Sequence, residues 1–288
     1  MLASDGSIAP IISIDDFTAY ESDISVGPKV HLVDVRWYLD GRSGRAAYEN
    51  GHLPGAIFLD LDEVLAELAS VDDGRHPLAT PERFATGLGQ LGIATGDVVV
   101  AYDDLGGMVA SRLVWMLRIL DQPAALLNGG LMAWNSQFGL DLETTINNNE
   151  AVERAPMPWP STATASADEV EEHIANGGTV VDSRSANRYR GENEPVDARA
   201  GHIPGAVNAP FGGNLTTGGL FLSRKHLTER FAELRVDENT IFYCGSGVSA
   251  CHNVLAVESI GLDRPKLYVG SWSQWAADQS RAIAPQPS

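Results

Sequence analysis

The sequence predicts an α/β protein of two similar domains, each with a mainly parallel sheet flanked by helices. Two observations support this prediction. Short apolar stretches typical of buried strands alternate with segments of helical periodicity, which is the pattern of parallel sheets. The chain also repeats its own order of motifs, and its 288 residues, 44% of them hydrophobic, suffice for two packed cores.

An internal repeat organises the chain. The turn Gly51–Ala56, with the sequence GHLPGA, recurs as GHIPGA at Gly201–Ala206. A buried-strand pattern that ends in an acid and an arginine precedes each copy, at 32–36 and 180–184. Further matching pairs are a second strand at 98–102 and 240–243, and a late segment that begins with glycine and ends in tryptophan, at 129–134 and 270–275. The shared order of these motifs predicts two domains of one fold.

Local signals mark two helix starts. Thr80 is a good N-cap residue, and Pro81 after it suits the first helical position. The sequence Ser-Ala-Asp-Glu at 166–169 is a capping box. It predicts a helix that runs to about Asn176, where two glycines follow.

A polar stretch separates the two halves. Asn, Glu, Pro, Ser and Thr dominate it, and Pro156, Pro158 and Pro160 favour an extended chain. We therefore expect a linker at 141–163. The first domain then covers residues 1–140 and the second covers residues 164–288.

One of the two cysteines, Cys244, lies where a strand gives way to a helix. Residues 241–243 predict the strand, and apolar residues at helical spacing predict a helix over 248–260. A short loop follows Cys244 and leads into this helix; it consists of Gly245, Ser246, Gly247, Val248 and Ser249. A thiol at this place faces successive backbone N–H groups and the positive end of a helix, and both favour the thiolate. We therefore predict that Cys244 is a nucleophile rather than a buried structural thiol.

The first half has no counterpart of this thiol. Asp103 follows Tyr102 where Cys244 follows Tyr243 in the second half. We therefore expect one active site, on a catalytic second domain, and a non-catalytic first domain. The other cysteine, Cys251, is expected to be a small core-facing residue of the following helix. Two cysteines cannot form a four-ligand zinc site, so neither a metal nor a cofactor is expected.

The charge balance restricts the partners. With 38 acidic and 20 basic residues the formal net charge is −18, which disfavours binding to nucleic acid or to an anionic membrane. Residues 1–10 lack the pattern of a secretory signal, and the apolar stretch 113–120 is short and interrupted by Arg118. A reduced, cytoplasmic protein fits this composition best. An anionic substrate would need local cations.

These motifs together resemble the tandem-domain rhodanese-like sulfurtransferases, over about residues 14–275. The resemblance rests on the repeated turn, on the unit of strand, cysteine loop and helix, and on Gly-Ser-Trp at 270–272. The loop sequence CGSGVS at 244–249 is most similar to the CGSGVT of 3-mercaptopyruvate sulfurtransferases, whereas thiosulfate-preferring enzymes usually carry basic residues there. A tyrosine-phosphatase-like loop needs an arginine six positions after the cysteine, and Ala250 stands there, which argues against phosphatase activity.

The resemblance implies a two-step sulfur transfer. The thiolate of Cys244 attacks the outer sulfur of a small anionic donor and becomes a persulfide, and a thiol, cyanide or a thioredoxin-like protein then accepts the sulfur. The backbone amides of 245–249 stabilise the negative charge. The leading donor is 3-mercaptopyruvate. One alternative is a thiosulfate:cyanide sulfurtransferase, and another, from a different class, is a non-catalytic sulfur-carrier or binding protein.

Two arginines are candidates for binding the donor. Arg188 matches the family arginine that binds the anionic end of the donor, and a guanidinium can offer two parallel N–H donors to a carboxylate. A second arginine often follows Glu-Pro in mercaptopyruvate enzymes, but Val196 stands at that position. This departure keeps thiosulfate open as the donor. Arg199, three residues further on, is the candidate replacement.

Three polar residues have two open interpretations each. Ser246 either hydrogen-bonds the substrate or forms the turn, and Ser249 either caps the helix or bonds the sulfur. His52 matches a histidine that is proposed in some relatives to join a Ser–His–Asp relay. It recurs as His202 in the other half, which favours a scaffold role.

Overall fold

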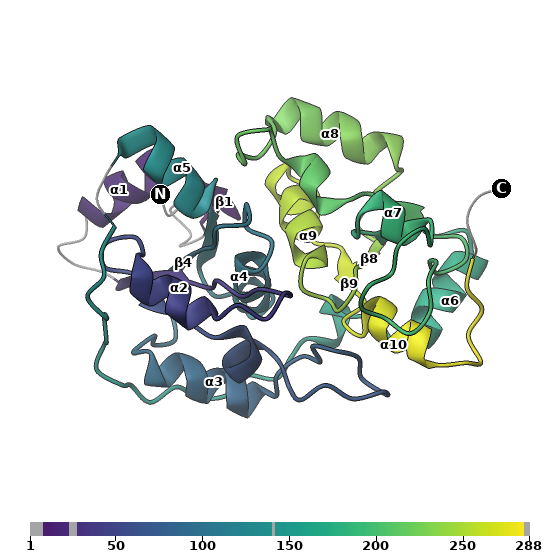
Figure 1. Cartoon of the computed structure of the whole chain (residues 1–288), viewed down its shortest axis with the longest axis horizontal. Coiled ribbons are helices and arrows are strands. Elements are labelled where there is room, and N and C mark those ends of the chain that lie inside the picture. The colour runs from purple at the N-terminus through teal and green to yellow at the C-terminus, as the bar shows by residue number, and fades with distance from the viewer. Residues whose placement is uncertain (1–7, 23–27, 140–141, 285–288) are drawn as a thin grey trace. The chain divides into compact units, whose positions relative to one another are not determined.

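The structure is a computed structural model that describes residues 8–22, 28–139 and 142–284 (Figure 1). It divides into two compact units. Unit 1 comprises Met1–Ala66, Ala79–Trp159 and Thr216–Phe221, and unit 2 comprises Glu67–Leu78, Pro160–Leu215 and Leu222–Ser288. Each unit therefore includes a short segment from the other half of the sequence. These two segments are Glu67–Leu78 and Thr216–Phe221, and each is followed by a helix. The N-cap residues of the two helices are Thr80 and Ser223, whose side chains make the capping hydrogen bonds.

Unit 1 contains a parallel sheet with the strand order β1-β5-β4-β2-β3. Its strands are β1 (Ile11–Ile12), β2 (Val30–Asp34), β3 (Ile57–Phe58), β4 (Val98–Tyr102) and β5 (Ala124–Leu127). Its helices are α1 (Ile14–Ser22), α2 (Gly44–Asn50), the π-helical turn η1 (Leu61–Leu65), α3 (Pro81–Gln90), α4 (Ala110–Arg118) and α5 (Gly130–Phe138). Strand β4 pairs with β5 and β2 on its two edges, and all five of its residues are buried, as is typical of a parallel sheet whose two faces are both covered.

Unit 2 repeats this sheet with the strand order β7-β6-β8-β9, again parallel. Its strands are β6 (Val180–Asp182), β7 (Val207–Asn208), β8 (Ile241–Tyr243) and β9 (Lys266–Leu267). Its helices are α6 (Ala167–Ala175), α7 (Ala186–Tyr189), α8 (Arg224–Glu233), α9 (Ala250–Ser259) and α10 (Ser271–Ala277), with 3₁₀ turns η2 (Ser161–Ala163) and η3 (Phe211–Asn214). A parallel bridge from Thr164 to Leu267 stands where β1 pairs with β5 in unit 1. The predicted fold class is confirmed.

Both predicted helix starts are confirmed. The side chain of Thr80 accepts a hydrogen bond from the Arg83 N–H, and Pro81 opens α3. The capping box between Ser166 and Glu169 makes both of its hydrogen bonds, and α6 ends at Ala175.

The strands β2 and β6 end at an aspartate, two residues before the arginine that closes each predicted stretch. Arg36 turns back onto Asp34 (Nη2–Oδ2 2.7 Å) and donates to the Gly51 carbonyl at 2.8 Å. Arg184 makes the same two contacts with Asp182 (2.6 Å) and with the Gly201 carbonyl (2.7 Å). Both pairs are buried, so each guanidinium ties the end of a strand to the repeated turn.

Much of the predicted linker packs on unit 1. The backbone of Glu143 pairs with that of His52, and the N–H of Val152 donates to the Gly89 carbonyl at 2.9 Å. The indole N–H of Trp159 donates to the Ala79 carbonyl at 2.8 Å. These contacts explain why the boundary between the units lies at residue 160.

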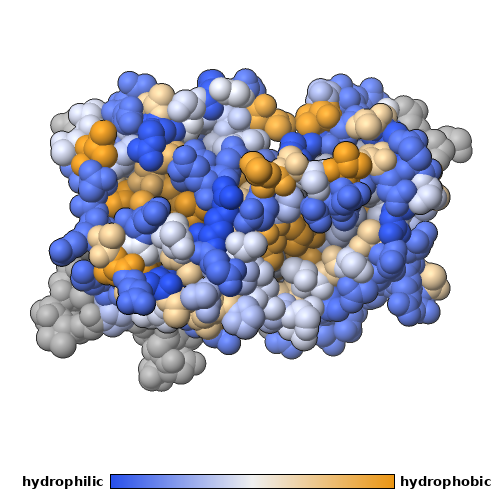
Figure 2. Space-filling view, turned by 90° about the horizontal axis from the view of Figure 1, so that it is seen from below, coloured by the Kyte–Doolittle hydropathy of each residue, from blue (hydrophilic) through white to orange (hydrophobic). Residues whose placement is uncertain are grey.

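The surface seen in Figure 2 is largely hydrophilic. On the face seen in Figure 2, hydrophilic residues predominate and hydrophobic ones form separate small groups. Among the described residues, no helix combines the length and the apolar character that crossing a membrane would need.

Candidate active site

Cys244 directly follows β8, and only 1% of its surface is exposed. Its backbone N–H donates to Ser271 Oγ at 3.1 Å, and its carbonyl accepts from the Trp272 N–H at 3.0 Å. Ser271 has a φ of 54°, a left-handed conformation that non-glycine residues rarely adopt. The start of the loop is therefore held against the first turn of α10, the Gly-Ser-Trp segment noted in the sequence.

The loop leads into the N-terminus of α9. Gly247 has a φ of 74°, a conformation that favours glycine, and it lets the chain turn sharply into the helix. Cys251 is buried in the first turn of α9, and its Sγ donates to the Gly247 carbonyl at 3.3 Å. Ser249 is the N-cap residue of α9, but its side chain makes no capping hydrogen bond in the described structure. Cys251 thus supports the loop from the core side, as expected of a structural thiol.

The equivalent loop of unit 1 follows β4 and surrounds the carboxylate of Asp103. The side chain of Asp103 is fully buried and accepts four hydrogen bonds from backbone N–H groups. These come from Leu105 (2.8 Å), Gly107 (2.7 Å), Val109 (2.8 Å) and Ala110 (3.0 Å). Burial raises the pKa of Asp103 above its ordinary value, although the four hydrogen bonds act in the opposite direction. In unit 1, the loop between strand and helix therefore gathers N–H groups around a negative charge.

The anchoring of these two loops is also equivalent. The Leu131 N–H, at the start of α5, donates to the Asp103 carbonyl at 3.1 Å. The Trp272 N–H, at the start of α10, makes the corresponding bond to Cys244. Asp103 and Cys244 therefore occupy matching places in the two units.

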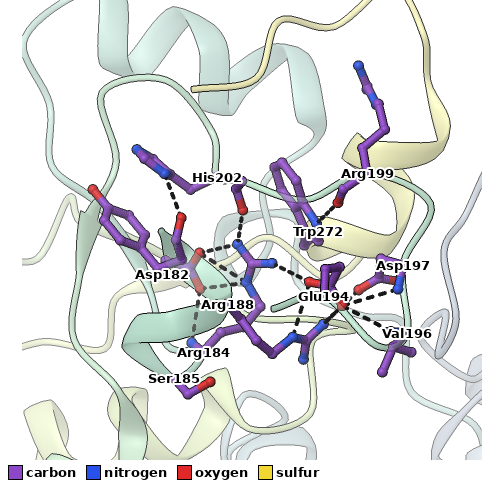
Figure 3. A network of polar contacts seen from close by, with 12 residues as sticks. Asp182, Arg184, Ser185, Arg188, Glu194, Val196, Asp197, Arg199, His202 and Trp272 are labelled. Atoms are coloured by element: carbon purple, nitrogen blue, oxygen red, sulfur yellow. Dashed lines mark hydrogen bonds and ion pairs between the residues drawn. The ribbon is translucent and has the colours of Figure 1, made fainter. Parts of the chain in front are cut away.

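Arg188 lies on α7 within a network of alternating charges (Figure 3). Its guanidinium binds Glu194 through Nε (3.1 Å) and Nη2 (2.7 Å), and Nη2 also binds Asp197 at 2.9 Å. Glu194 additionally accepts from Arg184 Nη1 at 3.1 Å. Burial alone would raise the pKa of Glu194, but the hydrogen bonds and charge of Arg188 hold it below its ordinary value. Arg188 is thus oriented by two carboxylates rather than free in solvent.

The structure adds two residues that sequence reasoning missed, Arg75 and His76. They lie in the 67–78 segment, which belongs to unit 2. Arg75 Nη1 binds Asp197 at 2.6 Å, and His76 Nδ1 lies 2.8 Å from Ser246 Oγ in a buried hydrogen bond. One signal was available in the sequence: unlike His52, His76 has no counterpart in the repeat.

Two of the predicted positions make other contacts. The Arg199 guanidinium donates to four backbone carbonyls, those of Trp275, Ala276, Asp278 and Arg281, and in Figure 3 it points away from Arg188 and Glu194. His52 lies in unit 1, where its ring stacks on Tyr48 at 3.8 Å. His202 stacks on Tyr189 at the same distance in unit 2, so this pair repeats like the rest of the scaffold.

Known proteins were compared with the whole chain. A family model described as "Rhodanese-like domain" matches residues 20–137 and 166–278. A protein of Pseudomonas aeruginosa named "Probable 3-mercaptopyruvate sulfurtransferase" is 38% identical over 264 residues, which are 89% of this chain and 93% of that protein. The thiosulfate sulfurtransferase of Rattus norvegicus is 34% identical over 260 residues, 87% of this chain and 86% of that protein. The crystal structure of SseA from Escherichia coli, described as a 3-mercaptopyruvate sulfotransferase, is 29% identical with a TM-score of 0.77, and the match covers 92% of this chain and 100% of that one.

Proposed function

The chain belongs to the rhodanese-like sulfurtransferase family, and on this basis we propose that it transfers sulfur through a persulfide on Cys244. The observation that most supports this is the position of Cys244. It occupies the place in unit 2 that Asp103 occupies in unit 1, where four backbone N–H groups converge on an anion. A loop of this kind suits a thiolate and a persulfide in the same way, because both are anions formed at that point.

The proposed reaction has two steps. With 3-mercaptopyruvate, the Cys244 thiolate attacks the donor sulfur, an S–S bond forms and the C–S bond breaks. The electron pair leaves on the enolate of pyruvate, which then takes up a proton. An acceptor thiolate or cyanide next attacks the outer sulfur, the S–S bond breaks, and the Cys244 thiolate returns. A thioredoxin-like protein can serve as the acceptor thiol.

The surrounding residues have distinct roles in this proposal. Arg188 binds the anionic end of the donor. Ser246, inside the loop, offers a hydroxyl to the donor or to its enolate, and the hydrogen bond to His76 fixes its orientation. Arg199 has no part in donor binding, because backbone carbonyls occupy its guanidinium.

The preferred donor is 3-mercaptopyruvate. The loop 245–249 carries no basic side chain, and this supports an α-keto acid over thiosulfate. Thiosulfate is the second candidate, because Val196 stands where a second arginine would bind the keto acid. Since specificity is a ratio of kcat/KM values, the test is to measure both donors with the same acceptor. We expect the higher kcat/KM with 3-mercaptopyruvate.

Cysteine variants test the mechanism itself. Cys244→Ser should lose all turnover, whereas the matched control Cys251→Ser should keep most of it. Mass spectrometry should find one added sulfur atom on Cys244 after the donor and its loss after the acceptor. Full turnover by Cys244→Ser would refute the persulfide mechanism. A persulfide that no small acceptor discharges would instead favour a sulfur carrier.

A further inference from the structure

The 67–78 segment of unit 2 leaves two large apolar side chains in solvent. Leu68 is 83% exposed and Val71 is 72% exposed, the two highest values of any large hydrophobic side chain among the described residues. Single exposed apolar residues are ordinary on soluble proteins, but these two lie three positions apart on one turn. Apolar surface gathered on one short segment indicates a place where another molecule makes contact.

The turn that carries them has a fixed shape. Ser70 and Gly74 exchange two backbone hydrogen bonds, at 3.1 Å and 3.0 Å. Below this pair, the Glu67 N–H donates to the Pro77 carbonyl at 3.1 Å. The two apolar side chains are therefore presented by a closed loop, and a partner that covers them orders little additional chain.

The turn is also joined to the Cys loop through α10. The Arg75 N–H donates to Ser273 Oγ at 3.0 Å, and the Ser273 N–H donates to the Gly245 carbonyl at 2.9 Å. Five residues of extended chain span at most about 18 Å, so Val71 lies within that distance of His76, which bonds Ser246. An interface of ordinary size covers about 800 Å² on each partner, a disc roughly 30 Å across. A protein bound to the turn can therefore also reach the Cys loop.

The hollow beside the turn is acidic. The residues that line it include Val71 and Asp72 from the turn, and Gln274, Asp278 and Arg281 from α10 and the chain after it. The cation among them, Arg281, already pairs with Asp278 and with two carboxylates of α6. Negative charge therefore predominates here, next to the exposed apolar side chains.

We propose that the turn around Leu68 and Val71, with this acidic hollow, is the docking surface for a protein thiol that accepts the sulfur. This rests on the proposed function of the site. Reactive cysteines lie in electropositive surroundings, since a nearby Lys or Arg stabilises the thiolate. The surface around such a cysteine complements the hollow in charge, and its apolar side chains would cover the turn. The acceptor thiolate then attacks the outer sulfur of the Cys244 persulfide, a new S–S bond forms on the acceptor, and the electron pair of the broken S–S bond returns to Cys244.

The test compares a double variant, Leu68→Ser with Val71→Ser, with the control Leu262→Ser. Leu262 is another exposed apolar residue of unit 2, at 38% exposure. Each protein is assayed with cyanide, with 2-mercaptoethanol and with reduced thioredoxin as the acceptor. In the double variant, kcat/KM for thioredoxin should fall about ten- to hundredfold, as expected for two apolar side chains that a partner no longer buries. The values for the two small acceptors should stay within about twofold of the parent, and so should all three values of the control.

A charge variant tests the acidic part of the surface. Asp72→Asn should weaken the salt dependence of kcat/KM for thioredoxin, because a charge at the edge of an interface acts mainly on the rate of association. The matched control is Asp263→Asn, at an exposed position beside Leu262. Equal salt dependence in the parent and in Asp72→Asn would contradict a role of the hollow in docking.

The small acceptors separate this inference from the proposed reaction. A parent that transfers sulfur to no acceptor, cyanide included, contradicts the proposed function. A parent that is active with cyanide, and whose kcat/KM for thioredoxin is unchanged in the double variant, overturns only the docking surface. An equal loss with cyanide and with thioredoxin also overturns it, because the turn would then act on the reaction itself. Sedimentation tests a second copy of the chain as the occupant: a parent dimer that the double variant loses would assign the turn to self-association and overturn the inference.

Discussion

Replacing Asp103 by alanine tests whether this type of loop stabilises an anion. Each hydrogen bond from a backbone N–H to a carboxylate contributes about 1.5–3 kcal/mol, and Asp103 accepts four. Together they offset part of the cost of burying the charge, and burial still raises the pKa of Asp103 above its ordinary value. The alanine variant loses both contributions and leaves four N–H groups without an acceptor, at about 1–3 kcal/mol each. Because water entering the vacated space relieves part of this, we expect a net loss of about 3–5 kcal/mol in the free energy of unfolding.

The assay is urea unfolding with formate as a chemical probe. Formate has the size of the deleted carboxylate, so it should stabilise Asp103→Ala increasingly with concentration and leave the parent unchanged. Because the chain divides into two compact units, the unfolding curve is fitted with one transition for each. Asp15→Ala, at an exposed position on α1, is the matched control and should change stability by less than about 1 kcal/mol. An Asp103→Ala protein as stable as this control would refute the argument that the backbone N–H groups of this loop stabilise an anion. The main support for a thiolate at Cys244 would be lost with it.

Two further predictions concern unit 2. Since His76 and Ser246 share one hydrogen bond, His76→Ala and Ser246→Ala should each lower kcat about ten- to hundredfold, and the double variant should lose no more than the larger single effect. Additive losses in this kinetic cycle would show that the two residues act separately. The lowered pKa of Glu194 means that its ionised form stabilises the folded state above the unfolded value of about pH 4.3. This contribution to stability is lost as the pH falls through the pKa that Glu194 has in the folded state. In chemical unfolding, the free energy of unfolding of Glu194→Gln should therefore fall less than that of the parent between about pH 5 and pH 3. Parallel curves for the parent and the variant would contradict this assignment.

The fold followed from the sequence because its local signals agree with one another. The predicted strand at 98–102 coincides with β4, and the capping box fixed the start of α6. The strands that end at Asp34 and Asp182 were each predicted to end two residues too late. Apolar patterning cannot register that the arginine after each strand folds back onto the aspartate. That contact depends on the tertiary position of the repeated turn.

The site was less accessible to sequence reasoning, since it depends on which segments meet. Arg199 was a candidate because it lies near Val196 in the sequence, but its guanidinium donates to backbone carbonyls in the last turn of α10 and just after it. Arg75 and His76 precede Cys244 by well over a hundred residues in the chain. Only the association of the 67–78 segment with unit 2 brings them to the Cys loop.

The repeat nevertheless contains information about the site, provided that the differences between its copies are considered. Residues with a counterpart in the other half brace the scaffold, such as Arg184 with Arg36, and His202 with His52. Residues without one gather around the Cys loop. Arg188 precedes the stacked Tyr189, whereas alanine precedes the stacked tyrosine of unit 1. In a duplicated fold, equal residues in equal places serve what both copies share, which is folding and the shape of the loop between strand and helix. The reaction needs in addition the residues that one copy has alone, first of all Cys244.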